Sequence, residues 1–267
     1  MLQIFFLAML AVPVRAEGQL ENVIPRMQGA DVVIVGEVHD NPDHHVNQYT
    51  VLKALQPKAV VWEMLTSEEA GRITSEMIYA PERLASAVEW SQSGWPAFSM
   101  YHQVFLAAPD ARIFGGEVPR EAALATVQSG PASAFGAEAA RYGLTEPLPK
   151  AEGDVREALQ FAAHCEAMPR DRMRTMVDIQ RLRDAVLARE VIKAMNETGG
   201  PVAVITGNGH ARRDWGVPVY LDRVQPDLNV FVLGQSEDGQ IDGAFDAIID
   251  SDAPAREDPC DAFRDNG

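Results

Sequence analysis

The sequence predicts an α/β fold, with a mostly parallel central sheet flanked by helices and a helical insert. Short runs of continuous apolar, β-branched residues alternate with longer amphipathic stretches, which is typical of parallel strands joined by helices. In addition, the pattern Gly-x-x-His occurs at Gly36–His39 and again at Gly207–His210, each time directly after an apolar run. Both histidines are therefore expected where a strand gives way to a loop, the edge at which open α/β sheets bind ligands.

Length and composition are those of one well-packed domain, expected over residues 17–267. The hydrophobic fraction of 46% and the aromatic fraction of 7% are ordinary for a folded helix-rich protein. The formal net charge is −16. This charge argues against a nucleic acid or an anionic membrane surface as partner, because both would repel the average face of the protein.

The first sixteen residues have the pattern of a secretory signal peptide. Leu2 to Val12 is almost continuously apolar but too short to span a bilayer as a helix. Val14 and Ala16 place small residues where a signal peptidase requires them, before Glu17. A cysteine that could carry a lipid anchor is absent near this cut. We therefore expect an exported, periplasmic or secreted protein without stable membrane insertion.

Six segments have the composition of strands. They are Asp31 to Val35, Ala59 to Met64, Ala111 to Gly115, Pro201 to Thr206, Asn229 to Leu233 and Gly243 to Ile249. Because helical stretches separate the first four, the strands are expected to pair in parallel through right-handed crossovers.

The predicted helices follow from apolar spacing and proline positions. Pro42 suits the first turn of a helix whose apolar stripe is Val46, Tyr49, Leu52 and Leu55. Three helices are expected between the second and third strands, over Ser67 to Ile78, Pro81 to Trp90 and Pro96 to Ala108. The helical insert, residues 120–198, is expected to hold helices over Ala132 to Tyr142, Asp154 to Cys165 and Pro169 to Glu197. The insert could serve as a lid, as a dimerisation arm or simply as packing.

The chain has two cysteines, Cys165 and Cys260. An oxidising compartment favours one disulfide, which would tie the Pro-rich tail, residues 250–267, onto the domain. Two free, buried thiols are the alternative.

Five residues that can carry chemistry fall at the carboxyl ends of predicted strands: Glu37, His39, Glu63, Glu117 and His210. Two imidazoles with carboxylates can hold a divalent metal such as Zn, Mn or Co, with His39, His210 and Glu37 as ligands and a remaining glutamate as base. The alternative is that each histidine caps a helix or hydrogen-bonds a neighbouring loop.

At these positions the sequence resembles a known family. The motifs that carry the resemblance are Ile34 to Pro42 with His44-His45, the strand ending in Glu63, Gly94-Trp95-Pro96 with Tyr101, Val118-Pro119-Arg120, Met168-Pro169 before a helix with Gln180 and Asp184, and Gly207 to Arg212 with Gly216-Val217-Pro218. Over residues 30 to 235 the chain resembles the ChaN-like haem-binding uptake proteins, which share a superfamily with the Tiki proteases, TraB and erythromycin esterases.

The resemblance implies an exported α/β protein with a helical insert that takes part in iron uptake. It implies haem bound between two protomers, with a tyrosine as iron ligand and a histidine from the partner chain. The Tiki branch implies instead a metal-dependent hydrolase that uses the two Gly-x-x-His histidines and the nearby glutamates. A haem or iron-complex binder, dimeric when loaded, is our first hypothesis, and the hydrolase is the alternative.

Four further residues are candidates for contact with haem. Tyr79 and Tyr101 are the plausible sources of a phenolate ligand, although a tyrosine at such a position is commonly a core residue. Arg120 and Arg212 each follow a motif at the sheet edge and could bind a carboxylate such as a haem propionate, or form salt bridges within their loops. Of the two histidines that open the first helix, His45 is expected at the surface.

Overall fold

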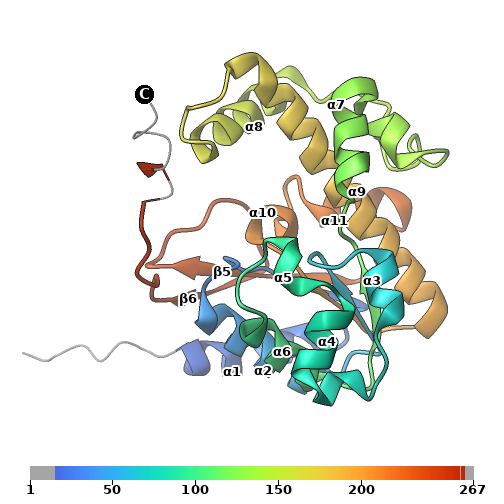
Figure 1. The fold of residues 1–267 in the computed structure, drawn as a ribbon, viewed down its shortest axis with the longest axis vertical. Coiled ribbons are helices and arrows are strands. Elements are labelled where there is room, and N and C mark those ends of the chain that lie inside the picture. Colours follow the sequence, from blue (N-terminus) through green and yellow to red (C-terminus); the bar gives the residue numbers. More distant parts are fainter. Residues whose placement is uncertain (1–15, 259, 262–267) are drawn as a thin grey trace, which may run out of the picture.

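The computed structural model describes residues 16–258, 260 and 261. The signal peptide expected over residues 1–16 lies outside the described residues except for Ala16, and the last six residues of the predicted tail also lie outside. Six strands form one parallel sheet in the order β3-β2-β4-β1-β5-β6 (Figure 1). The strands are β1 (Val32–Val35), β2 (Ala59–Trp62), β3 (Arg112–Gly115), β4 (Val202–Ile205), β5 (Val230–Glu237) and β6 (Ala247–Ser251).

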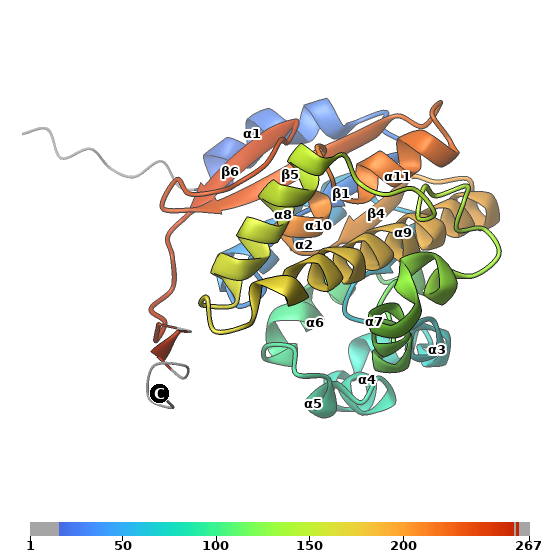
Figure 2. The same cartoon turned by 90° about the horizontal axis from the view of Figure 1, so that it is seen from above.

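Helices cover both faces of the sheet (Figure 2). The helices that precede or lie between β1, β2 and β3 in the sequence are α1 (Ala16–Met27), α2 (Pro42–Leu55), α3 (Ser67–Arg72), the 3₁₀ helix η1 (Met77–Tyr79), α4 (Pro81–Ala87), α5 (Trp90–Ser93) and α6 (Phe98–Ala107). Those that follow β3 are α7 (Arg120–Phe135), α8 (Lys150–Ala163), η2 (Arg170–Arg172), α9 (Met173–Thr198), α10 (Asn208–Ala211) and α11 (Val217–Val224).

The alternation of side chains along each strand divides the core into two halves. In β1, Val33 and Val35 pack with the half that includes α2 and α6, whereas Val32 and Ile34 pack with the half that includes α9 and α11. All four residues are fully buried, because a parallel sheet covered by helices on both faces leaves neither side to solvent.

All six predicted strands form, and the predicted α/β class is confirmed. The observed strands β1 to β4 are one or two residues shorter than predicted, so that Glu63 lies just beyond β2 rather than inside it. Strand β6 begins at Ala247 instead of residue 243, because Gly243 has a positive φ of 119° in the connection from β5.

The predicted apolar stripe of α2 is only half correct, because Leu52 and Leu55 pack in the core but Val46 and Tyr49 do not. Val46 and Tyr49 are 49% and 37% exposed, whereas His44 and His45 are fully buried. The prediction of a surface role for His45 is therefore wrong. The reason is that the polar residues of α2 find hydrogen-bond partners inside the protein: Asn47 donates to Gln235 at 3.0 Å, and the Nε2 of His45 lies 2.9 Å from the backbone oxygen of His39.

The helical insert forms, but its first helix begins earlier than expected. Helix α7 starts at Arg120 and ends at Phe135, with a kink at Gly130, whose φ of 78° precedes Pro131. The expected helix over Ala132 to Tyr142 is thus only partly correct. Helices α8 and α9 lie close to their predicted positions; α9 packs against one face of the sheet, and α8 packs against α9.

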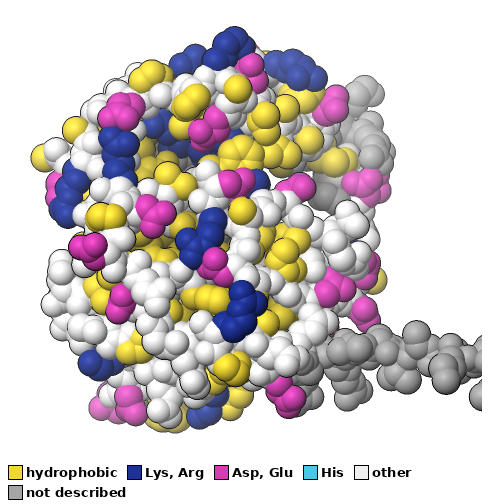
Figure 3. Space-filling view, turned by 180° about the vertical axis from the view of Figure 1, so that it is seen from behind, with side chains coloured by type: hydrophobic (Ala, Val, Ile, Leu, Met, Phe, Trp, Pro, Cys, Tyr) yellow, Lys and Arg dark blue, Asp and Glu magenta, His cyan; other side chains and the backbone are white. Residues whose placement is uncertain are grey.

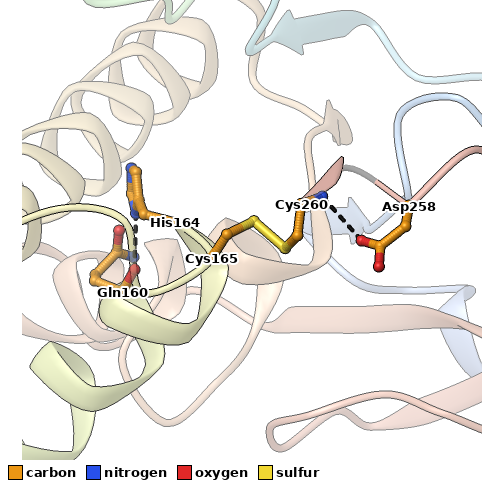
Figure 4. The surroundings of a disulfide bond; sticks show 5 residues. All are labelled: Gln160, His164, Cys165, Asp258 and Cys260. Carbon is orange, nitrogen blue, oxygen red and sulfur yellow. Dashed lines mark hydrogen bonds between the residues drawn. A yellow bond between two sulfur atoms is a disulfide. The ribbon is translucent and has the colours of Figure 1, made fainter. Parts of the chain in front are cut away.

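The predicted disulfide joins Cys165 to Cys260 across a separation of 95 residues (Figure 4). It links the turn after α8 to the C-terminal segment that follows β6. A second attachment lies earlier in this segment, where Arg256 pairs with Asp40 at 2.7 Å and with Glu237 at 2.6 Å. The C-terminal segment therefore connects the sheet edge to the far end of the insert.

Candidate functional site

A cavity of about 420 Å³ lies between the carboxyl edge of the sheet and the helical insert. His39 and His210 both line it. Strands β1 and β4 are neighbours, with Val35 opposite Ile205, so the loops that follow them start side by side. This adjacency brings together two motifs that are far apart in the sequence, as the strand-end argument predicts.

Glycine is required where these two loops meet. A Cβ atom on Gly207 would lie 3.0 Å from Nε2 of His39, and a Cβ atom on Gly36 would collide with the side chain of Asn208. The Asn208 side chain in turn donates to the backbone oxygen of Gln235 at 2.7 Å. The glycines of both motifs therefore allow the two loops to pack closely enough to share one cavity.

Glu37 holds His39 in place from behind. The Oε1 atom of Glu37 lies 2.7 Å from Nδ1 of His39 and accepts a hydrogen bond of 2.8 Å from the hydroxyl of Tyr101. Its other oxygen accepts a hydrogen bond from Gln48. Because a carboxylate can only accept, the proton of this hydrogen bond is on Nδ1 of His39. The other ring nitrogen, Nε2, is the His39 atom nearest to Gly207.

Glu37 and His39 each stabilise the charged form of the other. Burial alone would raise the pKa of Glu37, but the hydrogen bond from His39 and the charges of His45 and His39 hold it below the ordinary value. For His39, burial alone would lower the pKa, but the bond to Glu37 and the charges of Glu63 and Glu37 raise it to about 9. At neutral pH the pair is therefore a carboxylate and an imidazolium.

His210 forms a second carboxylate–histidine pair in the wall of the same cavity. Its Nδ1 lies 2.6 Å from Asp184 of α9, and its Nε2 lies 3.4 Å from Glu63, just beyond β2. Although burial alone would lower the pKa of His210, the charges of Glu63 and Asp184 raise it.

Glu63 links the two pairs. Its Oε2 accepts hydrogen bonds from the hydroxyl of Thr206 at 2.6 Å and from the backbone nitrogen of Gly207 at 2.7 Å. Burial would raise the pKa of Glu63, but the charges of His210 and His39, with these hydrogen bonds, lower it to about 2. A single buried carboxylate thus lies within the field of both histidines.

The other predicted site residues are divided between this cavity and the rest of the molecule. Arg212 lines the cavity, and its guanidinium binds Asp214 at 2.8 and 2.6 Å. Arg120 is exposed at the first residue of α7 and does not line the cavity. Glu117 lines a separate cavity of about 390 Å³ beside α7 and α9, where burial raises its pKa to about 7.

Neither predicted tyrosine faces the main cavity. Tyr79 is 67% exposed on η1 and is not among the residues that line the cavity. Tyr101 is fully buried, donates to Glu37 and contacts the ring of His45 edge-on. Burial and the charge of Glu37 raise the pKa of its hydroxyl, so that the phenolate form is disfavoured.

Among the polar and aromatic residues of the cavity wall, three belong to none of the motifs found in the sequence: Arg156, Gln160 and Trp215. They come from α8 and from the loop before α11, and the guanidinium groups of Arg156 and Arg212 both lie over the Trp215 ring, at 5.3 and 3.9 Å from its centroid. Asp184 and Gln180 of α9 belong to the quoted motifs, but their place beside His210 follows from the fold.

The described residues do not contain a cluster of metal ligands. Across residues 16–258, 260 and 261, no group of three or more histidine, cysteine, aspartate or glutamate side chains is arranged to hold a metal ion. In this part of the chain, no helix is both long and apolar enough to cross a membrane. The imidazole of His39, with its side chain 33% exposed, is the group of the site that a ligand in the cavity can reach most easily.

Comparison with known proteins defines the class of this fold and site. No curated protein sequence matches the chain. The profile of the haem-binding uptake family (Tiki superfamily, ChaN) matches residues 23–221, and the chain belongs to this family.

Solved structures of other proteins are similar to this chain. The structure described as cofacial heme binding to ChaN of Campylobacter jejuni matches 85% of this chain and 91% of its own, with 20% sequence identity and a TM-score of 0.63. The type III effector HopBA1 matches 88% of this chain and 94% of its own, with 10% identity and a TM-score of 0.49. The first of these likenesses supports the fold.

Proposed function

We propose that this protein is an exported binder of haem or of a related iron complex, acting in iron uptake, and that the cavity between the sheet edge and the helical insert receives the ligand. The observation that carries the proposal is that His39 and His210 share this cavity in a member of a haem-binding family. The relative from Campylobacter jejuni is described as binding haem cofacially, which supports haem as the ligand class.

Among the candidate ligands of the haem iron, His39 fits best. Its Nδ1 is fixed by Glu37, and its Nε2 lies at the opposite side of the ring, as in an imidazole oriented for coordination. Haem iron supplies a Lewis acid that accepts the lone pair of a neutral imidazole. Because the pKa of His39 is about 9, coordination at neutral pH requires loss of the Nε2 proton.

The insert offers a surface for a second protomer. Hydrophobic side chains gather over it on the face shown in Figure 3. Four exposed residues of α7 and α8 belong to its surface, and Leu159 also lines the cavity: Leu124, Val127, Val155 and Leu159 are 51%, 44%, 54% and 39% exposed. A loaded homodimer would cover such residues, which are otherwise a liability in water.

A haem titration tests the proposed function. The purified protein, titrated with ferric haem, is expected to give a saturable Soret band, and His39→Ala is expected to shift this band. Sedimentation with and without haem reports dimerisation, and fractionation of cells tests export. A wild-type protein that shows no saturable band would contradict the proposal.

A hydrolase is the second candidate, and the two carboxylate–histidine pairs favour it. Glu37–His39 and Asp184–His210 each have the arrangement that orients an imidazole for general acid–base catalysis. In this alternative a divalent metal such as Zn, Mn or Co would be held by His39, His210 and Glu37, with Glu63 or Glu117 handling a proton. The described residues do not present these side chains as a metal site, because Glu37 is already engaged by His39, Tyr101 and Gln48. Glu117 lines another cavity, so Glu63 is the better placed of the two.

Metal analysis distinguishes the hydrolase from the binder. The hydrolase predicts stoichiometric metal in the purified protein and loss of both metal and peptide or ester hydrolysis in His39→Ala and His210→Ala. Protein without metal, in which both variants retain any hydrolysis that the wild type shows, would exclude this metal-dependent mechanism.

A further inference from the structure

Arg156 is the most deeply placed cation of the main cavity. It lies on α8, in the middle of the helical insert, and its side chain is only 9% exposed. It lines the cavity from the insert side together with Gln160, whereas His39 and His210 line it from the sheet side. A ligand that fills the cavity would therefore meet this guanidinium as well as the two histidines.

The charge of Arg156 is only partly compensated by its neighbours. Among its contacts within the described residues, one hydrogen bond of 3.2 Å joins it to Glu152, and Asp184 lies at 3.9 Å, too far for a hydrogen bond. Asp184 is in any case engaged by His210 at 2.6 Å. A guanidinium has five N–H donors, so most of those on Arg156 have no acceptor among these contacts.

Arg212, unlike Arg156, has a carboxylate partner within hydrogen-bond distance of two of its nitrogen atoms. Its guanidinium makes two hydrogen bonds to Asp214, at 2.8 and 2.6 Å, in the paired geometry that satisfies both charges. Both arginines lie over the ring of Trp215, so the aromatic side chain holds the two cations at one end of the cavity. Of the two, Arg156 is the one with donors to spare.

We infer that Arg156 binds a carboxylate group of the ligand, so that the cavity selects ligands that carry a carboxylate beside the wall formed by the insert. A guanidinium that lines a cavity and has donors to spare suits such a group, because a planar carboxylate accepts two parallel hydrogen bonds from it. This inference rests on the proposed function and extends it, because the propionates of haem are such carboxylates.

The test compares a ligand that has free carboxylates with one in which they are blocked. Ferric haem and its dimethyl ester are titrated separately into the wild type, Arg156→Gln, Arg156→Lys and Arg172→Gln, with affinity measured from the absorbance change. Arg172 is a matched control, because it is an exposed arginine of the same insert that does not line the cavity. Circular dichroism and thermal melting establish that each variant is folded.

For Arg156→Gln we expect haem to bind about tenfold to a hundredfold more weakly, the range for loss of a charge-assisted pair, while the ester binds as it does to the wild type. Arg156→Lys should recover part of the haem affinity, since it keeps the charge but not the two-pronged geometry. Arg172→Gln should change neither affinity.

Two results would overturn the inference and leave haem binding intact. Equal weakening of haem and ester by Arg156→Gln would show that Arg156 only supports the fold, and unchanged affinity for both would show that it does not contact the ligand. If the wild type bound neither compound, the proposed function would fail, and the inference with it.

Discussion

Glu37 is the residue on which the hydrogen bonds of the candidate site converge. It accepts from His39, Tyr101 and Gln48, which come from three different elements of the fold. A buried carboxylate is costly unless such donors surround it. The Gly-x-x-His pattern predicted Glu37 and His39 correctly as neighbours of a cavity, but Tyr101 proved to be a donor to Glu37 rather than a residue exposed to a ligand.

Glu37→Gln is expected to lower the pKa of His39 from about 9 towards the ordinary value for histidine, because the bond to a negative charge is among the main causes that raise it. An NMR titration of the His39 ring protons measures this change. Asp43→Asn, at an exposed acid on the first turn of α2, is the control and should leave the titration as in the wild type. An unchanged pKa in Glu37→Gln would show that Glu37 does not stabilise the imidazolium.

Glu117 makes folding depend on pH in a predictable direction. Its pKa is raised to about 7 in the folded protein, mainly by burial, so that ionising it costs stability between its unfolded pKa of about 4.3 and pH 7. We expect Glu117→Gln to raise the melting temperature relative to the wild type at pH 8, and to change it little at pH 4. A difference that is equal at both pH values would contradict the raised pKa.

At the scale of elements, the strands were predictable and the orientation of α2 was not. Strands β1, β2 and β4 are short apolar runs buried on both faces, a pattern that depends on local sequence alone. The buried face of α2 depends instead on partners far along the chain, such as Gln235 for Asn47. Apolar spacing also does not reveal three local breaks: α7 is kinked at Gly130, the helix expected over Ser67 to Ile78 ends at Arg72, and Glu89, with a φ of 49°, separates α4 from α5.

The orientation of α2 can be checked by a matched pair of truncations. Leu52 is fully buried and Val46 is 49% exposed, one turn and a half earlier on the same helix. Leu52→Ala is expected to reduce the free energy of unfolding by about 2–5 kcal/mol, and Val46→Ala by less than about 1 kcal/mol. Denaturant titration measures both, and an equal loss in the two variants would show that Val46 faces the core together with Leu52, as the predicted stripe required.

At the scale of the whole molecule, the sheet order and the disulfide assemble the site. The order β2-β4-β1 places Glu63, His210 and His39 at neighbouring strand ends, which the sequence indicated only through strand-end reasoning. Arg156 and Trp215 could not be predicted, because their place in the cavity depends on how the insert folds over the sheet. The disulfide was predictable from the two cysteines, and its place at the end of a helix followed from the predicted helix over Asp154 to Cys165.

Removal of the disulfide tests how the C-terminal segment holds the insert. Cys165→Ser with Cys260→Ser is expected to lower the free energy of unfolding by about 4 kcal/mol, since the bond closes a long loop in the unfolded chain. In the double cysteine variant, hydrogen exchange should increase most in α8. Arg256→Ala, which removes the ion pairs at the other end of the segment, should also increase exchange in α8, but to a smaller extent. Unchanged exchange in α8 in both variants would contradict this role.

The central claim is that His39 and His210 border one ligand cavity, and ferric haem tests it directly because its unpaired electrons broaden nearby NMR signals. With the histidine ring signals assigned, we predict that one equivalent of ferric haem broadens those of His39 and His210 most strongly. The signal of His102, which hydrogen-bonds to the backbone of Ile78 away from the cavity, should be broadened least. Haem that binds while leaving either of the two cavity histidines sharp would contradict the account.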